Sequence, residues 1–323
     1  MRGTGDGLTI MPEASRRKLS IVTPVYFNAD SLPALFERLQ WLEGELNLRN
    51  VDLELIFVDD GSGDASLEEL LKIKAARPAT KVVSLARNFG AVAASKTGFR
   101  YVTGDAFLIL AADLQDPPEQ VLTMADEWLA GEKFVVSVRE ARRDPAPTRL
   151  FAWAYYKMVD LMVVPGYPRG GFDLFLMDKV MLPYMAGSVK RTNPTVYAWW
   201  LGFRPKVLHY TRQERKYGKS RYTFRKKLRF LFDTFTGFSA TPIRALSAFG
   251  IVVACLSFLY GITVVLAALF GDIPVPGFPT LAALISFFSG MILIMLGTLG
   301  EYLWRIFDAV SNKPESVVDE EFL

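Results

Sequence analysis

The sequence changes character abruptly near Ala245, and this change constrains the organisation of the chain more than any other feature. Between Ala245 and Gly300 almost every residue is apolar and Asp272 is the only charged one, whereas charged and apolar residues are mixed in the preceding part. The uncharged stretches Ala245–Phe270 and Phe278–Gly300 hold about 26 and about 23 residues, and each can cross a hydrocarbon core ~30 Å thick. Buried core helices rarely lack charge for so long. We therefore expect a mixed-composition domain followed by two membrane-spanning helices.

The distribution of basic residues predicts the orientation of this hairpin. The link Gly271–Gly277 contains no Lys or Arg. Basic residues stand on both flanks, at Arg225, Lys226, Lys227 and Arg229 upstream and at Arg305 downstream. Because short cytoplasmic segments are enriched in Lys and Arg, the link is expected outside and both chain ends in the cytoplasm. Residues 1–17 are polar and glycine-rich and show no secretory signal, so we expect the main domain to stay cytoplasmic.

Two segments have the composition of helices that lie in the membrane interface. Leu150–Val164 and Tyr222–Phe238 interleave aromatic with basic residues, a combination that suits the headgroup layer. An ordinary core-facing helix remains the alternative for both. The basic cluster Arg204–Arg229 is either a solvated face or, beside a membrane, a contact for anionic lipid or phosphate.

The counts of cysteine and histidine exclude several kinds of site. Cys255 is the only cysteine and lies in the apolar region, so a disulfide framework and a cysteine-based zinc site are excluded. His209 is the only histidine, which excludes histidine metal clusters and Ser-His-Asp triads. The net charge of +3 is too small to indicate a partner.

The first half of the chain alternates short apolar runs with helical patterns. Because the runs are apolar throughout, we expect a largely parallel α/β sheet that is covered on both faces. The predicted strands are Leu19–Val25, Leu53–Val58, Val82–Leu85, Ala106–Ala111 and Phe134–Val138. In such sheets ligands bind beyond the carboxyl ends of the strands. Polar clusters fall there, at Tyr26–Asn28, Asp59–Ser62, Arg87–Gly90 and Asp113–Asp116.

One of these clusters has the chemistry of a metal site. Asp113 and Gln115 follow an apolar strand and are two residues apart, so both side chains emerge on the same side. A carboxylate and an amide oxygen suit Mg²⁺ or Mn²⁺, which substrate phosphates can help to hold. A simple loop cap is the alternative explanation for Asp113.

Five motifs in a fixed order, together with the C-terminal Gly300–Ile306, carry a resemblance to a known family. The motifs are Thr23–Tyr26, Val58–Ser62, Arg87–Gly90, Ala112–Pro118 and Arg215–Tyr222. They resemble family 2 glycosyltransferases of the polyprenyl-phosphate sugar synthase type, which include bactoprenol glucosyltransferases and dolichyl-phosphate mannosyltransferases. The resemblance runs from about Leu19 to Pro314.

The resemblance implies a domain plan. A flexible tail of residues 1–18 precedes a Rossmann-like GT-A catalytic domain of residues 19–223, an interfacial amphipathic helix of residues 224–241, a transmembrane hairpin of residues 242–304 and a cytoplasmic tail of residues 305–323. Relatives suggest a tetramer. The expected partners are a nucleotide diphosphate sugar, polyprenyl phosphate and the bilayer, without nucleic acid.

The resemblance also implies roles for individual residues. For the nucleotide sugar these residues are Pro24, Tyr26, Asn28, Asp60, Ser62, Arg87, Asn88 and Ala112, with Asp60 bonding the base. Asp113 and Gln115 would hold Mg²⁺ or Mn²⁺ and, with Asp173 and Arg215, would form the catalytic set. Arg139, Arg149, Ser220 and Arg221 would grip the acceptor phosphate, since the guanidinium fork binds phosphate oxygens bidentately.

The implied reaction is inverting transfer of one sugar, glucose from UDP-glucose in the first instance, to undecaprenyl phosphate at the inner membrane. The product would be a lipid-linked sugar for modification of cell-envelope glycans such as lipopolysaccharide.

Two departures from the family pattern matter. Ala111 stands where many relatives have a carboxylate, and Phe27-Asn28 replaces Asn-Glu. The first shifts the metal onto Asp113 and Gln115 or weakens its binding, so a non-catalytic membrane scaffold or lipid-handling protein is the alternative. Gly218-Lys219-Ser220 matches the end of a P-loop motif, but Gln213 stands where the first glycine of that motif would be, so a P-loop is excluded.

Overall fold

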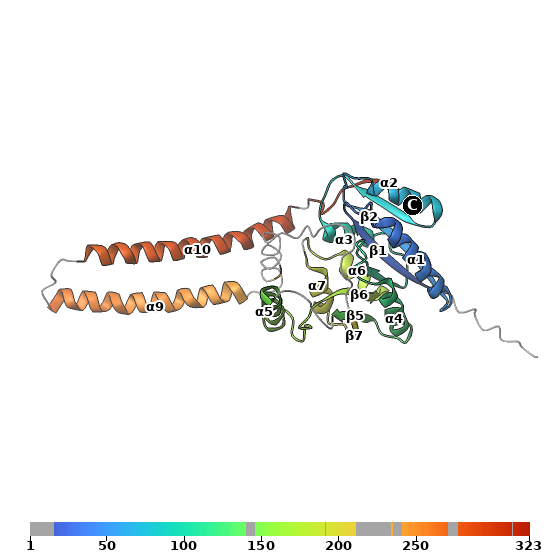
Figure 1. Ribbon diagram of the computed structural model, residues 1–323. Coiled ribbons are helices and arrows are strands. Elements are labelled where there is room, and N and C mark those ends of the chain that lie inside the picture. Colours follow the sequence, from blue (N-terminus) through green and yellow to red (C-terminus); the bar gives the residue numbers. More distant parts are fainter. Residues whose placement is uncertain are drawn as a thin grey trace, which may run out of the picture.

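The structure, a computed structural model, describes residues 16–139, 146–190, 192–210, 234, 241–270, 277–311 and 313–323. Its centre is an eight-stranded sheet of order β7-β5-β6-β4-β1-β2-β3-β8. The strands are β1 (Arg17–Val25), β2 (Val51–Asp59), β3 (Lys81–Leu85), β4 (Ala106–Ile109), β5 (Phe134–Arg139), β6 (Phe172–Asp178), β7 (Lys206–Tyr210) and β8 (Val318–Phe322). Helices cover the sheet and two long helices extend away from it (Figure 1).

The helices that pack on the sheet form two layers. They are α1 (Leu32–Asn47), α2 (Ser66–Ala76), α3 (Ala91–Phe99), α4 (Pro118–Leu129), α5 (Ala146–Met162), α6 (Leu182–Ala186) and α7 (Pro194–Trp200), with a 3₁₀ turn η1 (Lys179–Met181) before α6. One buried core cluster joins one sheet face to α1, α2 and α4. A second joins the opposite face to residues of α3, α5, α6 and α7.

The strands alternate their side chains between these two cores. In β1, Leu19 and Ile21 belong to the first core, whereas Val22 belongs to the second. In β2, Phe57 and Val58 divide in the same way. Because both faces are covered, every position of such a strand can be apolar, which is the reason for the continuous apolar runs in the sequence. The expected two-sided α/β sheet is confirmed.

The expected parallel arrangement is confirmed for the central strands, but two strands, β6 and β8, are antiparallel to their neighbours and correct it. β4, β1, β2 and β3 are mutually parallel, and β7 is parallel to β5. However, β6 is antiparallel to both β4 and β5. β8 is antiparallel to β3. The sheet is therefore mostly parallel, with two antiparallel strands, the internal β6 and the edge strand β8, that the sequence patterns did not indicate.

The structure differs from the expected boundaries at both ends of the chain. β1 begins at Arg17, inside the segment expected to be a tail. More importantly, residues 305–323 were expected to form a tail, but α10 continues to Val310 and Val318–Phe322 pairs with β3 as β8. The sequence of β8 is short and acidic, a composition that is poor in strand formers. It forms a strand because the edge of β3 offers unpaired backbone groups.

The two long helices are α9 (Thr241–Phe270) and α10 (Phe278–Val310). They run alongside each other away from the sheet (Figure 1), and Gly250 of α9 lies against the Met295 side chain of α10. Among the described residues, the stretch Phe287–Val310 is long and apolar enough to cross a membrane, with a mean hydropathy of 1.4 and no buried part. A second span in α9 stays a prediction.

The segments expected to be interfacial are only partly described. The first coincides with α5, in which Val159 is buried while Trp153 and Leu161 are 50% and 72% exposed. A helix with one face in the core and apolar side chains on the other suits an interface, but its lipid contact stays a prediction. The second, Tyr222–Phe238, and the helix expected at residues 224–241 lie outside the described residues except for Thr234 and Thr241.

Candidate functional site

The predicted site residues that follow β1, β2, β3 and β4 meet at one edge of the sheet. Because these strands are parallel and in register, with Val25 opposite Asp59 and Asp59 opposite Ser84, their carboxyl ends lie together. The loops after them carry Tyr26 to Asn28, Asp60 to Ser62, Arg87 to Gly90 and Ala112 to Gln115. Parallel sheets bind ligands at this edge. The structure therefore brings the predicted nucleotide and metal residues to one place, and their individual roles stay predictions.

The loops after β1 and β2 are bonded to each other. The backbone N–H of Phe27 donates to Ser62 Oγ at 3.1 Å, and that of Asn28 donates to Ser66 Oγ at 2.9 Å. Asn28 Oδ1 in turn accepts from the N–H of Tyr26 at 3.0 Å. Phe27 has a φ of 56°, a region that side chains other than glycine rarely occupy. Asn28 and Ser62 thus shape the loop in which Tyr26 is held.

Asp60 fastens the loop after β3. Its carboxylate accepts hydrogen bonds from the backbone N–H groups of Phe89 at 2.7 Å and Gly90 at 2.9 Å, and from Asn88 Nδ2 at 2.9 Å. Burial raises the pKa of Asp60 above its ordinary value, although the two backbone donors favour the ionised form. Asp60 was expected to bond the base of the nucleotide. In the structure its carboxylate holds the neighbouring loop.

Gly61 completes this contact because no side chain fits at its position. A Cβ there would lie 2.5 Å from the carbonyl carbon of Arg87, and its φ of +65° favours glycine. The turn after β2 therefore packs directly on the backbone of the loop that carries Arg87. The Arg87 guanidinium lies 4.1 Å from the centre of the Phe89 ring, and Nη1 donates to the Asn88 carbonyl at 3.2 Å.

Asp59 is a residue that the sequence reasoning left without a role. It is 2% exposed, and its Oδ2 accepts from the Ser62 N–H at 3.3 Å. Within the described ranges no donor reaches Oδ1. Burial raises the pKa of this carboxyl above its ordinary value. The adjacent pair of carboxylates in the motif was the only signal, and sequence alone does not say which member faces the loop.

The loop after β4 holds the predicted metal ligands. Asp113 Oδ1 accepts from the N–H of Gln115 at 3.1 Å, and Leu114 between them has a φ of 59°. Backbone in this conformation is held by its surroundings and is common at functional sites. The next carboxylate, Asp116, is buried and accepts from the Tyr210 hydroxyl at 2.7 Å. Tyr210, on β7, was missed because no sequence pattern links it to this loop.

The donor set fits a divalent cation that substrate phosphates help to hold. Asp113 and Gln115 are both half-buried, which leaves them within reach of a ligand. Hard cations such as Mg²⁺ take oxygen ligands and use one or two carboxylates where phosphates supply the rest. Within the described part of the chain no group of three or more His, Cys, Asp or Glu side chains could hold a metal alone.

The remaining predicted residues are placed only in part. Asp173 is exposed in β6, next to Phe172, which pairs with Val138 near the end of β5. Since β6 is antiparallel to β4, its start lies at the carboxyl edge with the site. Arg139 ends β5 opposite Tyr210, and Arg149 belongs to α5. Arg215, Ser220 and Arg221 lie outside the described residues.

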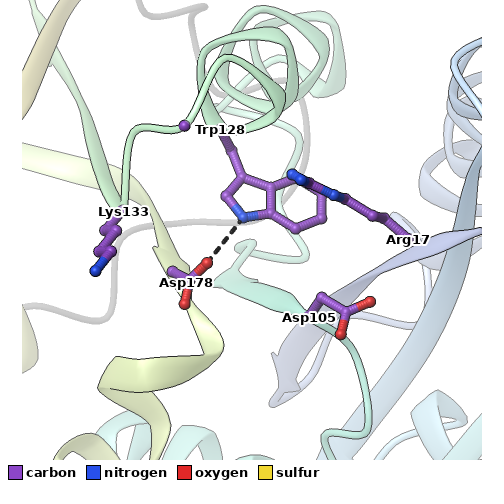
Figure 2. A pocket seen from close by; sticks show the side chains of 6 residues that line it. Arg17, Asp105, Trp128, Lys133 and Asp178 are labelled. Carbon is purple, nitrogen blue, oxygen red and sulfur yellow. Dashed lines mark hydrogen bonds between the residues drawn. The ribbon is translucent and has the colours of Figure 1, made fainter. Parts of the chain in front are cut away.

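A hollow of about 360 Å³ lies at the opposite edge of the sheet, lined by Arg17, Asp105, Trp128, Gly131, Lys133 and Asp178 (Figure 2). Its carboxylates have structural partners. Asp178 accepts from Trp128 Nε1 at 3.2 Å, and Asp105 accepts from the Lys18 N–H at 3.0 Å. The position at the amino ends of the central strands separates it from the candidate site.

Comparison with known proteins agrees with the fold and the motifs. Residues 20–168 match the family model described as "Glycosyl transferase family 2". A Bacillus subtilis protein named "Uncharacterized glycosyltransferase YkcC" is 34% identical over 306 residues, 94% of each chain. The chain belongs to the family 2 glycosyltransferases. The resemblance seen in the ordered motifs is thereby confirmed, and the edge that gathers Tyr26, Asp60, Arg87 and Asp113 is the candidate active site of a glycosyltransferase.

Further relatives of this glycosyltransferase cover nearly its whole length. "Uncharacterized glycosyltransferase sll0501" of Synechocystis is 32% identical and covers 94% of this chain and 95% of its own. The "SfII prophage-derived bactoprenol glucosyl transferase" of Shigella flexneri is 30% identical and covers 93% and 97%. Among solved structures, a mannosyltransferase from Pyrobaculum calidifontis in complex with GDP-Man and Mn2+ matches over 93% of this chain and 89% of its own at 16% identity, with a TM-score of 0.44.

Proposed function

We propose that this glycosyltransferase transfers one sugar, with inversion, from a nucleotide diphosphate sugar to polyprenyl phosphate at the cytoplasmic face of the plasma membrane. Glucose is the favoured sugar, UDP the favoured nucleotide and undecaprenyl phosphate the favoured acceptor. Support comes from the bactoprenol glucosyl transferase of Shigella flexneri, which is 30% identical over 93% of this chain. The product would be a lipid-linked sugar that serves as donor for modification of cell-envelope glycans.

The observation that carries the proposal is the return of the chain to the sheet after α10. β1 to β7 precede the hairpin and β8 follows it, yet all eight strands belong to one sheet. β8 must therefore lie on the same side of a membrane as β1 to β7. If Phe287–Val310 crosses the bilayer, α9 must cross it as well. This supports a two-pass hairpin with the active site beside the membrane that holds a lipid acceptor.

The acceptor explains why the site needs no strong base. A prenyl phosphate is already an oxyanion near neutral pH, which agrees with a chain whose single histidine is His209. The phosphate oxygen would attack the anomeric carbon in line with the leaving diphosphate. Arg139 and Arg149 would orient the acceptor phosphate, together with Arg215, Ser220 and Arg221. Arg87 would lie against the donor, held there by Asp60 and Gly61.

A divalent cation bound at Asp113 and Gln115 would neutralise the charge on the departing nucleotide diphosphate. Tyr210 would keep this loop in place through its bond to Asp116. Asp173, at the same edge of the sheet, would face the sugar. The tetramer that relatives suggest stays a prediction.

Ala111 favours a second candidate function. With alanine at this position the loop has one carboxylate fewer than many relatives, and a protein that has lost metal-dependent transfer would serve as a membrane scaffold or lipid-handling partner. Metal-dependent binding of a nucleotide sugar separates the two functions, because the enzyme requires it and the scaffold does not.

The test is sugar transfer by the purified, detergent-solubilised full chain. The protein is given undecaprenyl phosphate and a panel of radiolabelled UDP- and GDP-sugars, with Mg²⁺, Mn²⁺ or EDTA. We expect a labelled lipid from one donor, abolished by EDTA and by Asp113→Ala. Glu68→Ala is the matched control, because it removes an exposed carboxylate on α2 and should leave activity unchanged. No product with any donor, together with no nucleotide-sugar binding, would favour the scaffold over the enzyme.

A further inference from the structure

The segment that follows the membrane hairpin is bonded to the loop that carries Arg87. The backbone N–H of Ala86, the residue before Arg87, donates to the Val317 carbonyl at 3.0 Å. Val317 immediately precedes β8, whose residues pair with β3 along the edge of the sheet. The backbone bond that immediately precedes the Arg87–Gly90 loop is therefore made with the segment that leads into β8.

The same segment is bonded to α3, which begins directly after the loop. The Ser316 and Thr97 hydroxyl oxygens are 2.5 Å apart, and both residues are buried. Glu315 forms an ion pair with Lys96, which is itself 9% exposed. Contacts of this kind hold a segment in one position, because loss of a hydrogen bond or ion pair at a buried polar group costs free energy.

These contacts place the Arg87–Gly90 loop between two supports. On one side Asp60 accepts from Phe89 and Gly90, and Gly61 packs on the backbone of Arg87. On the other side residues 315–317 hold both ends of the loop, through Ala86 and through α3. Asp60 and Gly61 precede the loop in sequence, whereas residues 315–317 reach it only after the hairpin.

Further bonds connect this support to α10. Lys96 Nζ also donates to the Ser188 carbonyl at 2.5 Å, and Lys190 Nζ donates to the Asp308 carbonyl at 3.0 Å. Asp308 lies in the last turn of α10, which ends at Val310, and Glu315 follows after a short link. Residues 188–190 therefore bond both to Lys96 of α3, the partner of Glu315, and to the last turn of α10. A shift of α10 would be transmitted through them to the contact between Lys96 and Glu315.

We propose that Glu315, Ser316 and Val317 are positioning residues for the nucleotide-sugar site. They set the position of the Arg87–Gly90 loop and couple it to the end of the membrane helix α10, so that donor binding depends on the docked C-terminal segment. This inference rests on the proposed function, since that function makes the loop a donor site. The segment does not touch the reacting atoms; it acts through the loop.

The test compares Glu315→Gln and Ser316→Ala with Glu320→Gln in the full-length protein in detergent. Glu320 is an exposed residue of β8 and is the matched control. Hydrogen exchange is measured at the backbone amides of residues 86–90, and kinetic constants are measured separately for donor and acceptor. We expect faster exchange in the two variants and a donor KM raised about tenfold, the change that loss of one such coupling produces. The acceptor KM and kcat should stay close to those of the unaltered protein.

Each other outcome has a defined meaning. Unchanged exchange at residues 86–90 in both variants would overturn the positioning role, whatever the protein binds. Equal increases in donor and acceptor KM would reduce the segment to a general contribution to stability and would also overturn it. Failure of the unaltered protein to bind any nucleotide sugar, with faster exchange in the variants, would overturn the proposed function and the assignment of the loop as a donor site, while the mechanical coupling would stand.

Discussion

The carboxylate of Asp60 holds the backbone N–H of Phe89 at 2.7 Å, and this bond joins the turn after β2 to the loop after β3. Two motifs separated by more than twenty residues of sequence thereby form one wall of the candidate active site. Parallel strands present their loops at one edge, but a specific side chain is needed to keep two neighbouring loops in a fixed relation.

Replacement of Asp60 by asparagine is expected to loosen this wall. The amide keeps one acceptor oxygen but places an NH₂ group against backbone N–H donors, so at least one bond is lost. Loss of a buried hydrogen bond to a charged group costs ~1.5–3 kcal/mol of unfolding free energy. Chemical denaturation measures this cost, and donor affinity should fall with it. A variant with full stability and full donor affinity would contradict the structural role.

Replacement of Gly61 by alanine is expected to do more damage than backbone strain alone. Its Cβ would meet the Arg87 backbone at 2.5 Å. Gly202 is the matched control, since its φ of +79° is close to the +65° of Gly61 but nothing lies within 4 Å of its Cβ. Strain of this kind costs ~1–3 kcal/mol. Gly61→Ala should lose more stability than Gly202→Ala and should also lose sugar transfer. Equal losses in both variants would show that the close approach has no importance.

Glu54 is expected to make part of the stability depend on pH. Desolvation by burial opposes its ionisation, but hydrogen bonds from Lys81, Ser20 and Thr103 outweigh burial and lower its pKa. A lowered folded-state pKa contributes stability above the unfolded-state pKa, and this contribution disappears as pH falls through the folded-state pKa. Glu54→Gln should therefore destabilise the fold at neutral pH by ~2–3 kcal/mol and weaken the acid dependence.

The measurement is the unfolding free energy of Glu54→Gln and of the unaltered protein from pH 7 to acid. The two curves should converge at low pH, where Glu54 is protonated in both folded and unfolded chains. Parallel curves across the whole range would mean that the carboxylate does not contribute through its charge.

Tyr210→Phe is expected to loosen the loop after β4, which carries the predicted metal ligands Asp113 and Gln115, without a change of charge. The phenol oxygen is 2.7 Å from Asp116 Oδ1, and both residues are buried. Removal of the hydroxyl should cost ~1 kcal/mol of stability and raise the Mn²⁺ concentration needed for half-maximal transfer. The metal titration of transfer activity checks this, with EDTA-treated protein as the zero point. An unchanged titration would show that the bond between Tyr210 and Asp116 does not help to position Asp113.

The sequence predicted the central part of this protein well. The continuous apolar runs indicated strands covered on both faces, and β1 to β4 are such strands. The helical patterns between these runs indicated helices, and α1 buries Leu32, Leu35, Leu39 and Leu42 at helical spacing. These predictions succeeded because the pattern of burial along one element is recorded in that element. The gathering of four polar clusters at one edge followed from the same parallel arrangement.

The parts that sequence could not predict all depend on a partner elsewhere in the chain. β8 is acidic and short, and nothing in its five residues indicates a strand without the open edge of β3. The bonds of Asp60 to Phe89 and Gly90 could not be predicted either, because they arise from a contact across about thirty positions, and its role at the nucleotide base stays a prediction. Tyr210 and Asp116 are separated further still.

Local patterns in the sequence were enough to predict the class of sheet, the end of the sheet at which the polar motifs gather, the family and the two long apolar stretches. Each depends on composition and period within a short window, where local burial decides which residues can stand. The tertiary structure was needed to show that β8 returns to the sheet after the two long helices, that Asp60 holds a neighbouring loop, and that residues 315–317 contact Ala86 and α3 on either side of the Arg87–Gly90 loop. These facts depend on which distant backbone groups come within hydrogen-bond distance once the two cores have packed.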